Sequence, residues 1–150
     1  MLSLADLALR LAEVQGETVF TNGCFDLLHV GHTRYLQAAR GLGDRLVVGI
    51  NSDASVRTLK GPTRPILPEN ERAELLASLA CVDYVVIFSE PTADKLLSAL
   101  RPAIYAKGGD YSADTLPESS TVRAYGGEIS IVPFVPGRST TDIVARIQTL

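Results

Sequence analysis

The sequence has 150 residues, of which 46% are hydrophobic and 21% are charged, and its net charge is −3. This length fits one domain with a hydrophobic core, which we expect to span residues 1–150. The composition excludes a disordered acidic chain and argues against a general nucleic-acid binder, which would normally carry a basic patch or stripe.

The N-terminal segment, residues 2–16, predicts an amphipathic helix closed by a glycine. Asp6 and Arg10 interrupt its apolar pattern, so the segment does not resemble a signal peptide. No stretch approaches the roughly 18 apolar residues of a membrane-spanning helix. The two cysteines, Cys24 and Cys81, do not make a disulfide framework, and we expect reduced thiols in a cytoplasmic protein.

After this helix, apolar strand-like runs alternate with helical patterns. Strands are predicted over residues 17–22, 45–51, 83–88, 103–111 and 128–135. Helices are predicted over residues 29–43, 69–80, 91–100, 117–127 and 139–148. Residues 51–53 indicate a turn, and residues 58–68 contain one glycine and three prolines, which predicts a loop without regular structure.

This alternation predicts an α/β fold: a single Rossmann-like, doubly wound parallel sheet of about five strands with helices on both faces. Ligands of such sheets bind beyond the carboxyl ends of the strands. That rule selects four segments as the place of the site, namely residues 22–32, 51–64, 107–111 and 137–141.

The first of these segments, TNGCFDLLHVGH, contains both histidines of the chain. Gly23 permits a tight turn after the strand and close approach of a ligand to the backbone. The next helix points free N–H groups and the positive end of its dipole at the crevice, which makes an anion site. His29 and His32 are three residues apart and therefore share one helix face, where two imidazole donors suit a phosphate.

Other interpretations of this segment remain open. Each histidine could be a surface residue or a hydrogen-bonded core residue. Cys24, His29 and His32 could together bind zinc, although no C-x-x-C or H-E-x-x-H pattern is present. A cysteine nucleophile paired with histidine is a further alternative. The chain has neither a P-loop nor a G-x-G-x-x-G turn, which disfavours an NAD-binding module.

Two motifs at opposite ends of the chain resemble the signatures of the nucleotidyltransferase superfamily of cytidylyl- and adenylyltransferases. HVGH, after GCFDLL, is similar to the H-x-G-H signature, and GRSTTDIV is similar to the second signature, a Ser/Thr-rich helix start. Between them, NSDASVRTLKGPTRPI and AKGGDY resemble the adenylyltransferase half of ADP-heptose synthase. The similarity runs from about Thr18 to the C-terminus, and we expect a stand-alone chain without the kinase half.

The resemblance implies transfer of an adenylyl group from ATP, with Mg²⁺, to a heptose 1-phosphate. The products would be pyrophosphate and ADP-heptose, a precursor of lipopolysaccharide and surface glycans. The acceptor phosphate is already a nucleophile, so catalysis would rest on positioning and electrostatics. We expect a homodimer, and no zinc, nucleic acid or membrane as a partner.

Two rival functions stay open beside this one. A glycerol-3-phosphate or other alcohol-phosphate cytidylyltransferase is similar around the histidines, but often has an aromatic residue where this chain has Val30. A non-catalytic nucleotide-binding or phosphosugar-binding module would use the same fold without turnover.

Matching the motifs residue by residue, and adding the cations of the loops, assigns the predicted site. The predicted catalytic residues are His29, His32 and Lys60. The predicted nucleotide-binding residues are Asn22, Gly23, Cys24, Phe25, His29, His32, Lys107, Gly108, Asp110, Arg138, Ser139, Thr140 and Thr141. The predicted acceptor-binding residues are Asp26, Arg57, Lys60 and Arg64. Asp26 could instead orient the turn or lie near the metal, and the sequence names no metal ligands. The loop cations could equally be solvated charges, and Ser139–Thr141 could be only a helix cap.

Overall fold

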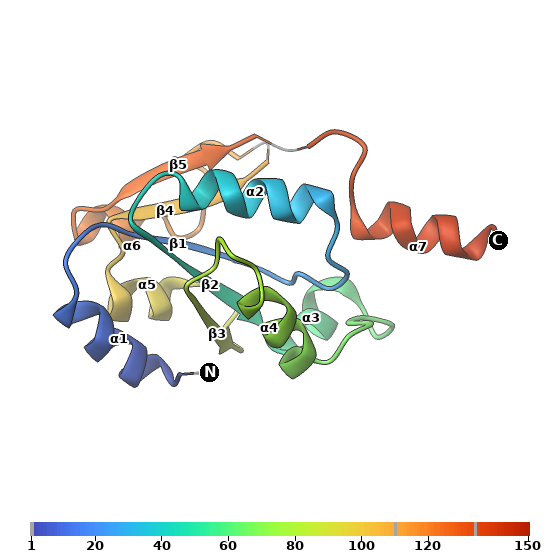
Figure 1. Ribbon diagram of the computed structural model, residues 1–150, viewed down its shortest axis with the longest axis horizontal. Helices are drawn as coiled ribbons and strands as arrows, with labels where there is room; N and C mark the ends of the chain where they lie inside the picture. The colour runs from blue at the N-terminus through green and yellow to red at the C-terminus, as the bar shows by residue number, and fades with distance from the viewer. Residues whose placement is uncertain (1, 110, 134) are drawn as a thin grey trace.

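The computed structural model describes residues 2–109, 111–133 and 135–150. Its strands form one sheet in the order β3-β2-β1-β4-β5, and every neighbouring pair is parallel. The strands are β1 (Thr18–Gly23), β2 (Arg45–Asn51), β3 (Tyr84–Phe88), β4 (Ile104–Gly108) and β5 (Glu128–Val132). The helices are α1 (Leu4–Glu13), α2 (Val30–Arg40), α3 (Asp53–Lys60), α4 (Glu69–Ala77), α5 (Asp94–Leu100), α6 (Ser119–Ala124) and α7 (Thr140–Gln148). The predicted Rossmann-like α/β architecture is confirmed (Figure 1).

Side chains of the central strands alternate between two hydrophobic clusters, one on each face of the sheet. Val19 packs with residues of α2 and α4, whereas Phe20, the next residue, packs with residues of α1, α5 and α6. Val48 and Val47 divide in the same way. The period of two follows from strand geometry, and both faces are apolar because helices cover both.

The strand order determines where a ligand-binding crevice can form. β1 lies between β2 and β4, so the chain runs outward to β3 on one side and returns to β4 and β5 on the other. This reversal is a topological switch point, where loops after two adjacent strands diverge and leave an open space. The loops that leave β1 and β4 at this point carry the two histidines and the KGGDY segment.

The structure corrects one prediction. Residues 53–60 form helix α3, whereas the sequence assigned residue 53 to a turn, residues 58–60 to the start of a proline loop and residues 54–57 to no element. Ser52 caps this helix by accepting a hydrogen bond from the Ser55 amide at 3.2 Å. Gly61, with φ of 102°, ends it, because a left-handed residue suits a helix end. The irregular loop therefore begins at Gly61, and Lys60 lies on the last residue of a helix.

The other predicted elements are present, but most are shorter at their ends. The strand expected over residues 128–135 ends at Val132, before Pro133, and Phe134 lies outside the described residues. The last helix, α7, extends beyond the body of the molecule at one end of its longest axis (Figure 1). None of the residues of α7 is buried. No described helix is long and apolar enough to cross a membrane.

Candidate active site

A cavity of about 850 Å³ opens beyond the carboxyl ends of β1 and β4, at the switch point. Its wall joins segments that are far apart in sequence. The predicted site residues that line it are Asn22, Gly23, Cys24, Phe25, Asp26, His29, His32, Lys60, Arg64, Lys107, Gly108, Arg138, Ser139, Thr140 and Thr141. The structure therefore brings both sequence motifs and the cations between them to one crevice.

Among the described residues that were predicted for the site, Arg57 is not part of that wall. Arg57 is exposed on α3 and does not line the cavity, although Lys60, one helical turn later, does. Asp110 lies outside the described residues. Because α3 was not predicted, the sequence offered no way to see that Arg57 and Lys60 differ in direction.

His29 is the N-cap of α2, with extended backbone angles. Its Nδ1 accepts a hydrogen bond from the Gly31 amide at 3.1 Å, which satisfies one of the free N–H groups of the helix start. In the neutral imidazole the proton must then lie on Nε2, which is left as a donor. Burial, with Arg138 adding to it and Asp142 opposing it, lowers the pKa of His29 below its ordinary value. The ring is therefore neutral at neutral pH.

Gly31 explains why a glycine separates the two histidines. A β-carbon at this position would lie 2.8 Å from Nδ1 and Cε1 of His29, closer than carbon atoms approach. Any side chain here would force the imidazole of His29 away from the helix start. Gly31 was not among the predicted site residues, and its place in the HVGH motif was the available signal.

His32 stacks on His29, with ring centroids 3.8 Å apart and planes 25° apart. Phe25 contacts the other side of the ring, at 5.2 Å between centroids. Burial, together with the neighbouring His29, lowers the pKa of His32 to about 4. Its Nδ1 is buried, and among the described residues it has no hydrogen-bond partner. A buried polar atom without a partner is unusual in a folded protein.

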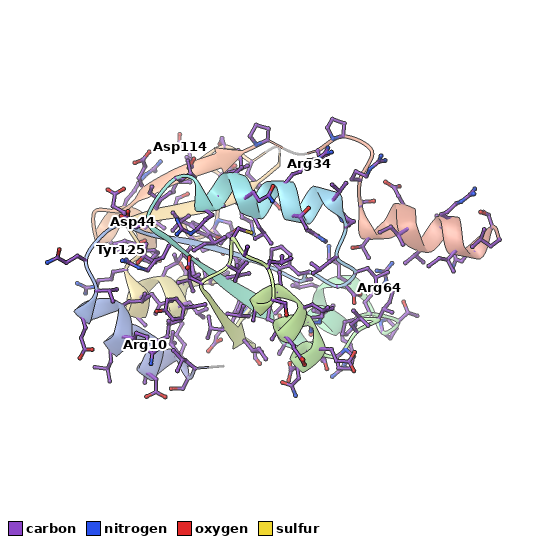
Figure 2. The ribbon with its side chains drawn as sticks, in the orientation of Figure 1. Arg10, Arg34, Asp44, Arg64, Asp114 and Tyr125 are labelled. Carbon is purple, nitrogen blue, oxygen red and sulfur yellow. The ribbon has the colours of Figure 1, made fainter. Side chains whose placement is uncertain are left out.

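Asp26 ties the β1–α2 turn to the proline loop. Its carboxylate accepts hydrogen bonds from the amides of Ile66 at 2.9 Å and Leu67 at 3.0 Å, and Arg64 lies 3.6 Å from it. This geometry favours the orienting role over direct contact with the acceptor. Arg64, labelled in Figure 2, sits in that loop and also faces the cavity.

Arg72 of α4 is a residue that the sequence analysis missed. Its side chain is fully buried and donates to the carbonyls of Cys24, Asn51 and Leu67 at 2.7 to 2.9 Å. It also pairs with Asp53 at 2.8 Å. The guanidinium thus joins the ends of β1 and β2 to the proline loop and to α3. One signal was available, because Arg72 lies one turn before Leu76 on the inward face of the helix.

Lys107 stands at the end of β4, facing β1. Its Nζ lies 3.5 Å from the carbonyl oxygen of Asn22, and burial lowers its pKa while Glu118 opposes that shift. The side chain of Asn22 is held by Tyr105, whose hydroxyl donates to Oδ1 at 2.6 Å. A cation is therefore placed at the centre of the switch point, above two fixed strand ends.

The second motif lines the cavity next to the N-terminus of α2. Ser139 caps α7 by accepting from the Asp142 amide at 3.0 Å, so its role as a cap is present in the structure. Thr140 donates to the carbonyl of Leu27 at 3.2 Å, which links α7 to the turn before α2. Thr141 is exposed and lines the cavity. Two helix N-termini, those of α2 and α7, therefore meet at one crevice.

The thiol and metal alternatives can be compared with this geometry. The Cys24 thiol donates to Oδ1 of Asn51 at 3.8 Å, and burial raises its pKa, which disfavours the thiolate that a nucleophile requires. Within residues 2–109, 111–133 and 135–150, no three His, Cys, Asp or Glu side chains gather as a metal site would need.

A family model described as cytidylyltransferase-like matches residues 20–146. The chain belongs to the cytidylyltransferase-like family. Among curated relatives, bifunctional protein HldE of Syntrophotalea carbinolica is 56% identical over 146 residues, which is 97% of this chain and 30% of that protein. HldE of Geobacter sulfurreducens is 56% identical over 136 residues, 90% of this chain and 28% of that protein. The chain thus spans less than a third of these relatives.

Solved structures agree with the fold. The lipopolysaccharide core biosynthesis protein of Thermoplasma volcanium is 31% identical, with a TM-score of 0.66 over 81% of this chain and 98% of that one. Pantoate-β-alanine ligase of Francisella tularensis, solved with beta-gamma ATP and β-alanine, superposes with a TM-score of 0.64 over 97% of this chain and 75% of that one. At 15% identity, the second likeness shows the fold alone.

Proposed function

We propose that this chain transfers an adenylyl group from ATP to a heptose 1-phosphate, giving ADP-heptose and pyrophosphate. The observation that carries the proposal is the stacked pair His29 and His32 at the N-terminus of α2, facing a cavity whose wall also contains the N-terminus of α7. Helix N-termini and neutral imidazole donors suit the oxygens of a polyphosphate. The substrates are proposed from the similarity to the HldE proteins.

In the proposed reaction, an oxygen of the sugar phosphate attacks the α-phosphorus of ATP in line. The new P–O bond forms as the bond from the α-phosphorus to the bridging oxygen breaks, and pyrophosphate leaves with that electron pair. The acceptor is already an anion, so no general base is required. The protein therefore acts by positioning and by stabilising negative charge, and a preorganised donor is worth more there than in water.

The residues divide this work by their place in the cavity. His29, through Nε2, and His32 would donate to the α- and β-phosphates. Ser139–Thr141 and the free N–H groups of α7 would hold the end of the triphosphate. Lys60 and Arg64, on the side of α3 and the proline loop, would hold the acceptor phosphate, and Lys107 stands between the two groups.

Mg²⁺ is the cofactor that we propose for the triphosphate. It prefers phosphate and carboxylate oxygens, and the triphosphate would supply most of its ligands, because the Asp26 carboxylate is already held by the amides of Ile66 and Leu67 and by Arg64. When bound, the ion would offset the charge of the triphosphate and of the leaving pyrophosphate.

The test is a pyrophosphate-release assay that crosses ATP, CTP and GTP with heptose 1-phosphates, glycerol 3-phosphate and other sugar phosphates. We expect the highest kcat/KM with ATP and a heptose 1-phosphate. Faster turnover of CTP with glycerol 3-phosphate would assign the chain to the alcohol-phosphate cytidylyltransferases. Binding of a nucleotide without release of pyrophosphate from any pair would indicate a non-catalytic module.

A further inference from the structure

The cavity wall contains a buried carboxylate that the proposed reaction does not use. Glu118 lies directly before α6, is only 5% exposed and lines the cavity. Its Oε1 accepts a hydrogen bond from the Ala93 amide at 3.2 Å, and no other described residue donates to this carboxylate. Because a carboxylate can accept about four hydrogen bonds, most of its acceptor capacity is not used by the protein.

Glu118 belongs to the α5 and α6 side of the sheet, whereas the two histidines begin α2 on the other side. Tyr105 of β4 packs in the cluster of α1, α5 and α6, and Lys107, two residues later, faces the same side. Glu118 raises the pKa of Lys107 against the effect of burial, which indicates that the carboxylate lies near this cation. The cavity thus has imidazole donors on the α2 side of the sheet and a carboxylate beside Lys107 on the α6 side.

The part of the cavity wall around Glu118 is apolar. It is formed by the end of β3 and by the segment before α6, with the side chains of Phe88, Pro91, Leu116 and Pro117. Phe88 and Leu116 belong to one buried cluster, and Pro91 lies two residues before Ala93. A carboxylate in such a wall repels phosphate but accepts hydrogen bonds from hydroxyl groups. This combination suits a sugar ring, which has apolar C–H groups and several hydroxyl donors.

This wall adjoins the side of the cavity that we assign to the acceptor phosphate. β3 pairs with β2, and the Ser52 amide at the end of β2 donates to the Phe88 carbonyl at 2.8 Å. Helix α3, which ends at Lys60, begins directly after Ser52. A sugar whose phosphate is held by Lys60 therefore has the wall of Phe88 and Glu118 within its reach, away from the N-termini of α2 and α7.

We propose that Glu118 binds the acceptor sugar by accepting hydrogen bonds from two neighbouring ring hydroxyl groups, and that it selects sugars by the position of those hydroxyls. Hydrogen bonds from a hydroxyl to a charged carboxylate are stronger than those between neutral groups. The inference rests on the proposed function, because it assigns the sugar of that reaction to one side of the cavity. Glu118 lies outside both sequence motifs, so the motifs did not identify it.

The first experiment replaces the carboxylate by an amide of the same shape. Glu118→Gln keeps an oxygen for the Ala93 amide but loses the charge and one acceptor oxygen. We expect kcat/KM for heptose 1-phosphate to fall by about 10–100-fold, mainly through KM, while the KM for ATP stays unchanged. Asp114→Asn is the matched control, because Asp114 is exposed in the same β4–α6 segment and does not line the cavity.

The second experiment removes the hydroxyl groups instead of the carboxylate. Heptose 1-phosphates that each lack one ring hydroxyl are compared as acceptors for wild type and for Glu118→Gln. With the analogue that lacks a hydroxyl bound by Glu118, wild type should lose about 10-fold or more in kcat/KM, and the variant should lose much less. A residue that only supports the fold would not produce this dependence on one hydroxyl.

A binding measurement keeps the inference separate from the reaction. Heptose 1-phosphate and inorganic phosphate are titrated calorimetrically into each protein in the presence of α,β-methylene-ATP, which cannot release pyrophosphate. Glu118→Gln should weaken the binding of heptose 1-phosphate by about 10-fold or more and leave that of inorganic phosphate unchanged. If wild type released no pyrophosphate with any pair of substrates, the proposed function would fail, and this titration would still decide the role of Glu118.

Two results would overturn the inference while the proposed function stands. Glu118→Gln could match Asp114→Asn in every constant and with every deoxy analogue, which would leave Glu118 only its contact with Ala93. Alternatively, Glu118→Gln could raise the KM for ATP or the requirement for Mg²⁺ with sugar binding unchanged, which would assign the carboxylate to the nucleotide or its metal. Thermal unfolding of both variants checks that the fold is retained.

Discussion

The two helices that point their N-termini at the cavity, α2 and α7, are held in different ways. α2 buries Leu36 and Ala39 in the core and begins with two stacked histidines whose rings are fixed by neighbours. α7 has no buried residue and meets the body through the hydroxyl of Thr140. The α2 side of the crevice is therefore packed into the core, whereas the α7 side is attached by fewer contacts. Substitutions on the α2 side should therefore reduce activity more than substitutions on the α7 side.

The largest expected effect is on the α2 side. His29→Ala and His32→Ala should each reduce kcat by about 10²–10³-fold, the loss typical of one preorganised donor to a transition state. The measurement is steady-state pyrophosphate release at saturating substrates. Val30→Ala, an exposed neighbour in the same turn, is the control and should keep full activity. Near-wild-type rates in both histidine variants would remove the pair from the mechanism.

The second largest expected effect is on stability and concerns Arg72, whose buried guanidinium joins the ends of β1 and β2. Arg72→Met should lower the free energy of unfolding by about 3 kcal/mol, because it leaves Asp53 and three carbonyl oxygens without their donor. Urea denaturation at neutral pH measures the change. Arg34→Met, on the exposed surface of α2 (Figure 2), is the matched control and should be nearly neutral. Equal stabilities of the two variants would show that the Arg72 network contributes little.

Substitutions in α3 should distinguish the binding of the acceptor phosphate from the binding of the triphosphate. Lys60→Ala should lower kcat/KM for the sugar phosphate by a factor equivalent to about 2 kcal/mol, because one charged contact to phosphate is lost. The KM for ATP should change less. Arg57→Ala removes a cation one turn away that does not line the cavity, and should change neither constant. A steady-state matrix in both substrates distinguishes them. If Lys60→Ala instead abolishes ATP binding, this side of the cavity belongs to the triphosphate.

On the α7 side we expect a smaller loss. Thr140→Val should weaken ATP binding by about 1 kcal/mol, because it removes the hydrogen bond to the Leu27 carbonyl that holds the N-terminus of α7 at the cavity. Thr140→Ser keeps the hydroxyl and should bind ATP like wild type. Calorimetric titration with ATP gives both affinities. A loss as large as that in the histidine variants would mean that α7 is as rigidly preorganised as α2.

Apolar periodicity decided which elements could be predicted from the sequence and which could not. The apolar strands and the glycine-bounded helices predicted the sheet and its covering helices, because burial on two faces leaves a periodic record in the sequence. Helix α3 was hidden, since Val56 is its one buried apolar residue and the helix lies between a turn signal and a proline loop. Its absence from the prediction placed Lys60 in a loop and gave Arg57 the same role as Lys60.

At the site, side chains in recognisable motifs were predicted to gather, and the cavity wall contains them. The residues missed were those that act through the backbone. Gly31 is needed because a β-carbon would displace His29, and Arg72 is needed because three carbonyls converge on it. Neither need is visible until the chain is folded, because each depends on atoms distant in sequence or on the direction of one ring. The roles of the individual residues remain predictions.

The last prediction concerns protons and comes from the α2 side of the crevice. Burial and His29 lower the pKa of His32 to about 4 in the folded protein, whereas an unfolded histidine has an ordinary pKa of about 6.5. Between these values the unfolded chain binds a proton that the folded chain does not. The stability contributed by neutral His32 is therefore fully present above pH 6.5 and is lost as the pH falls toward 4. His32→Gln cannot titrate, so its unfolding free energy, measured by urea denaturation from pH 7 to pH 5, should fall less steeply than that of wild type. Parallel curves would show that the folded and unfolded chains protonate this histidine alike, and would contradict a buried neutral ring stacked on His29. A steeper fall in the variant would reverse the sign and have the same consequence.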